Sequence, residues 1–176
     1  MCTSTPDTPK NCCDPQSMAE GYERLREMER RLNIAQVGHL MASERFHKLN
    51  MALYLPLFAL TLVIAACTFL DSDPFWKVVL QVAGIAAAAM SFVQPVLRFG
   101  ERAETHRLKG ARYGSLKRQV EFHLLKQPNM TSMAEFSNTM LHEWNSVAED
   151  SPLTPARIVR KAEAKFPKKA CAHCQR

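Results

Sequence analysis

The stretch MALYLPLFALTLVIAACTFL at residues 51–70 decides how the rest of the chain is interpreted, because it contains no charged side chain. As an α-helix it would be roughly 30 Å long, which is the thickness of the hydrocarbon core of a bilayer. A second apolar stretch, VVLQVAGIAAAAMSFVQPVL, follows at residues 78–97. We therefore expect two membrane-spanning helices, over 51–70 and 75–97, joined by a tight turn at Asp71–Pro74.

The charges that flank the two stretches predict their orientation. Basic residues near a membrane span stay on the cytoplasmic side, and the connection between the two stretches is acidic. Apart from Lys77 at the entry to the second span, the basic residues lie outside the pair, at Arg45, Lys48, Arg98, Arg102, Arg107 and Lys109. Both termini are therefore expected in the cytoplasm, and the chain is expected to be a multi-pass protein of the cytoplasmic membrane.

Composition sets broader bounds. The chain has 176 residues and a formal net charge of +6, which suits anionic lipid, nucleic acid or an acidic partner equally. Residues 1–16 lack the apolar core of a secretory signal, so secretion is not expected. The six cysteines gather near the termini and in one apolar stretch, which suits a reducing compartment better than a disulfide framework.

Periodicity and helix-breaking residues divide the remainder of the chain. The expected fold class is all-α, a two-span transmembrane helical hairpin with long cytoplasmic helical bundle extensions. A capping box at Ser132–Glu135 and an N-cap at Thr154 are expected to open the last two helices. The expected parts are a disordered tail at 1–17, an amphipathic helix at 18–50, the hairpin at 51–97, cytoplasmic helices at 98–166, and a basic, cysteine-containing tail at 167–176.

Two further segments carry a family resemblance. HRLKGARYGSLKRQVE at residues 106–121 and WNSVAEDSPLTP at residues 144–155, together with the leading amphipathic helix and two closely spaced spans, resemble the SLATT family. The resemblance covers the chain from about residue 22 to 166. It implies a two-span effector of bacterial antiphage conflict systems, located in the inner membrane, that permeabilises the membrane when activated.

Small and polar residues recur along one face of each expected span. Such faces most simply allow close helix packing, and they can also line a pore formed by several subunits. Threonine hydroxyls can also bond back to their own helix. The candidate positions are Gln81, Gly84, Ala88, Ser91 and Pro95 on the second span, and Tyr54, Thr61 and Thr68 on the first.

Other patterns suggest competing sites. Arg118 and His123 fit the Arg-x4-His spacing of one class of helical ribonucleases, although about one such match is expected by chance in a chain of this composition. Cys171, His173 and Cys174 would need Cys12 and Cys13 to complete a zinc site, so neither a metal nor another cofactor is expected. The histidines His39, His47 and His106 are expected at helix-surface or bundle positions.

The last expected helix is basic, with Arg157, Arg160, Lys161 and Lys165. Such a surface suits anionic lipid or an acidic signal, with lipid the simpler partner.

The leading functional hypothesis is an oligomeric, pore-forming membrane effector without enzymatic activity. Its expected partners are copies of itself, the bilayer, and a cytoplasmic sensor protein or nucleotide signal, whereas nucleic acid is not expected. The alternative is a membrane anchor or receptor that docks a partner through its cytoplasmic helices, and a membrane-tethered helical ribonuclease is a lesser alternative.

Overall fold

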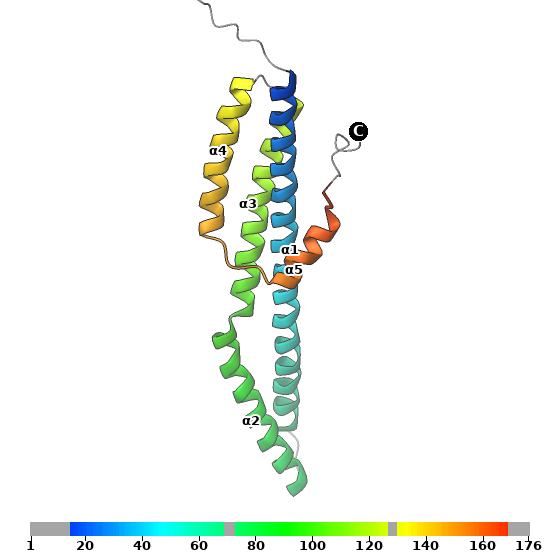
Figure 1. Ribbon diagram of the computed structural model, residues 1–176. Helices are drawn as coiled ribbons and strands as arrows, with labels where there is room; N and C mark the ends of the chain where they lie inside the picture. Colours follow the sequence, from blue (N-terminus) through cyan, green and yellow to red (C-terminus); the bar gives the residue numbers. More distant parts are fainter. Residues whose placement is uncertain (1–14, 69–72, 127–129, 169–176) are drawn as a thin grey trace, which may run out of the picture. The chain divides into compact units, whose positions relative to one another are not determined.

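The computed structural model describes residues 15–68, 73–126 and 130–168, and within these residues every regular element is an α-helix (Figure 1). Helix α1 runs from Pro15 to Thr68, so the expected amphipathic helix and first apolar stretch form one continuous helix. The other helices are α2 (Pro74–Leu97), α3 (Phe99–Leu125), α4 (Met130–Glu149) and α5 (Ala156–Lys165). The turn at 69–72 and most of both predicted tails, with Cys12, Cys13, Cys171 and Cys174, lie outside the described residues.

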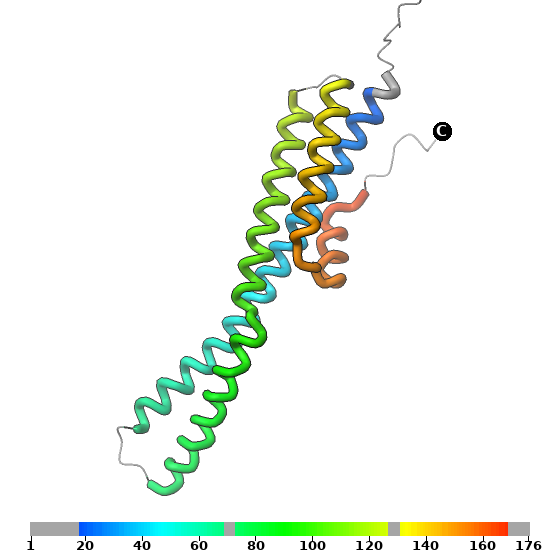
Figure 2. Tube along the Cα trace, turned by 90° about the vertical axis from the view of Figure 1, so that its left-hand side faces the viewer, coloured from blue at the N-terminus to red at the C-terminus, as the bar shows by residue number. Residues whose placement is uncertain are grey.

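Two compact units make up the chain, and α1 and α3 contribute to both. The first unit contains the described residues up to Asn33 together with Tyr113–Asp150. Figures 1 and 2 show its three helical segments, from α1, α3 and α4, side by side. Its core repeats at helical spacing on all three segments, as the amphipathic pattern predicts. The buried residues are Leu25, Leu32, Tyr113, Leu116, Val120, Met133, Met140 and Val147.

Charged side chains solvate the outer face of α1 in this first unit. Glu27 accepts hydrogen bonds from Arg30 and Arg31, each at 2.8 Å, and Glu20 pairs with Arg24 at 4.0 Å. The bonds from the two arginines lower the pKa of the Glu27 carboxyl to about 2. Such pairs between residues three or four apart support a helix by a few tenths of a kcal/mol each, roughly.

The second unit contains Ile34–Arg112 and the segment from Ser151 onward. In it α2 runs back along the C-terminal part of α1, as Figures 1 and 2 both show. We call α1 residues 51–68 and α2 the apolar helix pair. On the N-terminal side of the pair α1 continues against the first part of α3, where the small residues Ala42, Ala103 and Gly110 are buried. Gly38 is also buried, and a Cβ there would lie 3.9 Å from the Thr154 side chain. Helix α5 joins this unit through buried Ile158 and Ala162.

The helix ends show where local signals succeed and fail. Asp73 is the N-cap of α2 and Pro74 opens the helix, in keeping with the expected turn chemistry. Two cap predictions are wrong: Ser132 lies inside α4, which begins at Met130, and the N-cap of α5 is Pro155, one residue after Thr154. Caps from single side chains are weak signals because the neighbouring backbone can start the helix a residue or two earlier or later.

One backbone feature separates α2 from α3. Arg98 adopts a left-handed conformation with φ 48°, and it is the single non-glycine residue with positive φ among the described residues. Its N–H donates to the carbonyl of Gln94 at 3.0 Å, which closes α2. A left-handed residue with a Cβ costs about 1–2 kcal/mol, so the junction between the two helices is locally strained.

Candidate functional site: the apolar helix pair and its base

The apolar helix pair exposes most of its large side chains. Both α1 and the α2 region are long and apolar enough to cross a membrane, and their most apolar windows are 0% and 6% buried. The core helix of a soluble protein would have the opposite pattern. Exposed apolar surface of this extent is expected where lipid or another protein covers it. The exposed residues include Leu55, Phe58, Leu62, Val82, Ile85, Phe92 and Val96.

The inward stripe of the pair identifies how its two helices meet. On α1 the stripe repeats every three or four residues, and on α2 it centres on buried Ala87. The α1 members are half-buried Leu53, Leu57, Leu60, Ile64 and Cys67, and the α2 members are Leu80, Ala83, Gly84, Ala87, Met90 and Gln94. The inward stripe of α1 is thus mostly large and apolar, whereas that of α2 includes the small residues Ala83, Gly84 and Ala87.

The predicted polar stripes lie beside this contact and not within it. On α2, Gln81, Ala88, Ser91 and Pro95 are exposed, and only Gly84 reaches the inward stripe. At 100° per residue, the predicted polar stripe of α2 is centred about 90° around the helix from the inward stripe of α2. The α1 residues Tyr54, Thr61 and Thr68 are also exposed and are displaced by about 80°.

Both displacements have the same rotational sense along their own helices. Because α1 and α2 run in opposite directions, equal rotations bring the two stripes to the same flank of the pair. We call this the polar flank: Tyr54, Thr61, Thr68, Gln81, Ala88, Ser91 and Pro95. The sequence predicted two separate stripes, whereas the structure assembles them on one side.

The polar groups on this flank differ in how they are satisfied. Thr61 donates to the Phe58 carbonyl at 2.8 Å and Thr68 to the Ile64 carbonyl at 2.7 Å, as the back-bonding alternative predicted. Pro95 lies inside α2 and has no N–H, so the carbonyl of Ser91 loses its ordinary helical donor. The flank therefore presents the hydroxyl and the backbone carbonyl of Ser91 as groups that a polar neighbour could satisfy.

A buried histidine pair lies at the base of the apolar helix pair. His39 of α1 and His106 of α3 are 6% and 3% exposed, and their Nδ1 atoms are 3.0 Å apart. At this distance one imidazole donates its proton and the other accepts it. The Phe46 ring stacks on His106 with centroids 5.5 Å apart and on Phe99 at 6.1 Å, which extends the cluster toward the apolar pair.

Burial keeps both imidazoles neutral. Removal from water, together with the smaller effects of the nearby His106 and Lys109, lowers the pKa of His39 from 6.5 to about 4. Burial also lowers the pKa of His106. Desolvation disfavours the charged form of a histidine, so two facing imidazoles in this site resist protonation. Sequence reasoning assigned these histidines to surface or bundle positions and did not foresee their pairing.

A spacing signal for the cluster was present in the sequence. His39 and Phe46 are seven residues apart, and so are Phe99 and His106. Seven-residue spacing keeps two side chains on the seam between packed helices. His47, in contrast, is exposed.

The predicted ribonuclease residues do not meet. Arg118 and His123 are five positions apart on α3, about 140° around the helix, and Arg118 is exposed. The His123 ring stacks on Phe136 of α4, with centroids 3.9 Å apart and planes 5° from parallel. Its Nε2 is buried without a hydrogen-bond partner within the described residues, and burial lowers the pKa of its imidazole. Within this unit, His123 lies in a stacked packing contact.

The remaining candidate positions lie on α5 or outside the described residues. Arg157, Arg160, Lys161 and Lys165 are all exposed on α5. Among residues 15–68, 73–126 and 130–168, no group of three or more His, Cys, Asp or Glu side chains could hold a metal ion. Comparison with protein-family models, curated proteins and solved structures finds no match for the chain.

Proposed function

We propose that this protein spans the membrane twice through its apolar helix pair and assembles into an oligomeric pore that depolarises the bacterial inner membrane. The exposed apolar surface of α1 and α2 supports membrane insertion, because both helices are long enough to cross and neither is covered. The basic residues at the base of the pair favour cytoplasmic termini. The resemblance to SLATT proteins supports a role in antiphage defence.

The polar flank is the observation that carries oligomerisation. Within lipid, the carbonyl freed by Pro95 would lack a partner, which is unfavourable by several kcal/mol, roughly, and the Ser91 hydroxyl could bond only to its own helix. A neighbouring subunit or a column of water would supply those partners. One pair of helices is too thin to enclose water, so conduction needs a ring of pairs with the polar flanks turned toward its axis.

Flux through liposomes tests this proposal. Purified protein is reconstituted into liposomes loaded with a potassium indicator, and ion flux is compared with that of Ser91→Leu and of Ala86→Leu. Both positions are exposed on α2, but Ala86 lies on the opposite flank of the pair. We expect Ser91→Leu to abolish flux and Ala86→Leu to leave it unchanged.

Subunit number separates the pore from the anchor alternative. A membrane anchor that docks a partner through its cytoplasmic helices can work as a monomer or dimer, whereas a conducting ring needs several copies. Cross-linking in the membrane counts them. Flux that is equal in both variants, or a cross-linked species no larger than a dimer, would contradict the pore and favour the anchor.

A further inference from the structure

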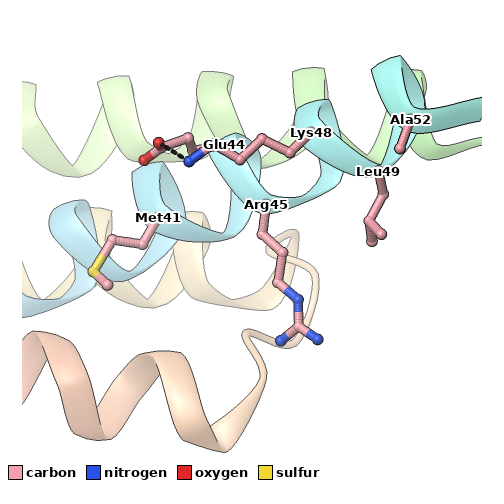
Figure 3. Close-up of a pocket in the computed structure, with 6 residues that line it drawn as sticks. All are labelled: Met41, Glu44, Arg45, Lys48, Leu49 and Ala52. Carbon is pink, nitrogen blue, oxygen red and sulfur yellow. Dashed lines mark hydrogen bonds and ion pairs between the residues drawn. The ribbon is translucent and has the colours of Figure 1, made fainter. Parts of the chain in front are cut away.

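A groove runs along α1 where the first apolar stretch begins. It has a volume of about 460 Å³ and is lined by Met41, Glu44, Arg45, Lys48, Leu49 and Ala52 (Figure 3). Most of these residues are exposed, so the groove is open. Residues at this point of α1 would lie at the level of the lipid headgroups if the stretch that follows spans the bilayer.

The groove combines one available cation with an apolar wall. Figure 3 shows Met41, Arg45 and Leu49 extending from α1 on one side, as spacing of four residues requires. Lys48 donates to Glu44 at 2.7 Å, so these two charges satisfy one another. Arg45 has no ion pair with any residue in the described part of the chain. Its guanidinium is therefore the groove's available anion-binding group.

Helix α5 adds positive charge to the same unit. Figure 3 shows α5 on the side of α1 toward which Arg45 extends. Its cations Arg157, Arg160 and Lys161 are exposed and form no ion pair within residues 15–68, 73–126 and 130–168. After the larger effect of Lys48, the charge of Lys165 also lowers the pKa of Glu44, which shows that the field of α5 reaches the groove.

We propose that this groove binds one anionic phospholipid, with the headgroup phosphate on Arg45 and an acyl chain along Leu49 and Ala52 toward the bilayer. A guanidinium forms two parallel hydrogen bonds to phosphate oxygens. The apolar wall favours a lipid over a soluble anion, because free phosphate or a nucleotide gains nothing from Leu49. The inference rests on the proposed membrane insertion and goes beyond it by naming a ligand and its contacts.

Lipid binding by the full-length protein in detergent tests the inference. Phosphatidylglycerol is titrated and the bound copies are counted by native mass spectrometry, with phosphatidylcholine as the zwitterionic comparison. The variants are Arg45→Gln, Leu49→Gln and Arg118→Gln. Arg118 is the matched control, because it is an exposed arginine whose loss changes the net charge equally. We expect Arg45→Gln to weaken phosphatidylglycerol binding about fivefold, the usual effect of one basic residue near an anionic membrane.

Each outcome decides for or against the lipid site. Weaker phosphatidylglycerol binding in Arg45→Gln and Leu49→Gln, with Arg118→Gln unchanged, supports it. Equal weakening in Arg45→Gln and Arg118→Gln, or displacement of the lipid by millimolar inorganic phosphate or an oligonucleotide, overturns it while leaving membrane insertion intact. Extraction of the wild-type protein from membranes by alkaline carbonate alone would overturn both proposals.

Discussion

Acidification should destabilise the fold through the buried histidine pair. The pKa of His39 is about 4 in the folded protein and 6.5 without burial, so folding favours the neutral imidazole. The stability gained by burying the neutral His39 imidazole is fully present above pH 6.5 and is lost as the pH falls toward 4. At 1.36 kcal/mol for each pKa unit, the total is about 3 kcal/mol, of which about 2 kcal/mol is already lost at pH 5. The lowered pKa of His106 acts in the same direction.

Thermal unfolding in detergent, followed by helical circular dichroism between pH 7.5 and 5, measures this loss. Glu27 does not confuse the result, because its folded pKa of about 2 lies below an ordinary value of 4.5 and its contribution is lost only at lower pH. His39→Gln keeps a hydrogen-bonding group opposite His106 and removes the titration of His39, while His106 still titrates. We expect that variant to lose most of the acid sensitivity, and His47→Gln, at an exposed position, to retain it. Equal acid sensitivity in the wild type and His39→Gln would refute the reasoning.

Four other substitutions test the packing and the backbone within the two units. Leu32 is 1% exposed, so Leu32→Ala should lower the free energy of unfolding by about 2–5 kcal/mol, as measured by chemical denaturation. Leu125 is 80% exposed, so the control Leu125→Ala should change the free energy of unfolding by less than about 0.5 kcal/mol. A Cβ at Gly110 would lie 3.2 Å from the Leu40 side chain, so Gly110→Val should lower the free energy of unfolding by about 1–3 kcal/mol. A melting temperature equal to that of the wild type would argue against the close contact of α1 and α3. Arg98→Gly should relieve the strain of the left-handed conformation and raise the free energy of unfolding by about 1 kcal/mol. A lower melting temperature in this variant would contradict that expectation.

Several features of the fold could be predicted from sequence because they depend on local patterns. The two apolar stretches appear as uncharged runs of sufficient length, and the buried residues Leu25, Leu32, Leu116 and Val120 follow helical periodicity. The start of α2 at Asp73-Pro74 follows from turn chemistry. The caps of α4 and α5 were misplaced by one to a few residues, because side-chain caps are a small energetic term.

What only the tertiary structure decided is which distant surfaces meet. His39 and His106 are 67 positions apart, and their contact depends on the register between α1 and α3, which small residues such as Ala42 and Ala103 permit. The sequence also does not determine which face of α2 packs against α1, because Ala83, Ala87 and Ala88 are equally able to pack. Helix direction and rotation then brought two predicted stripes to one flank. Local composition thus determined the helices and their apolar character, whereas side-chain packing between helices determined which polar groups are buried and which remain exposed.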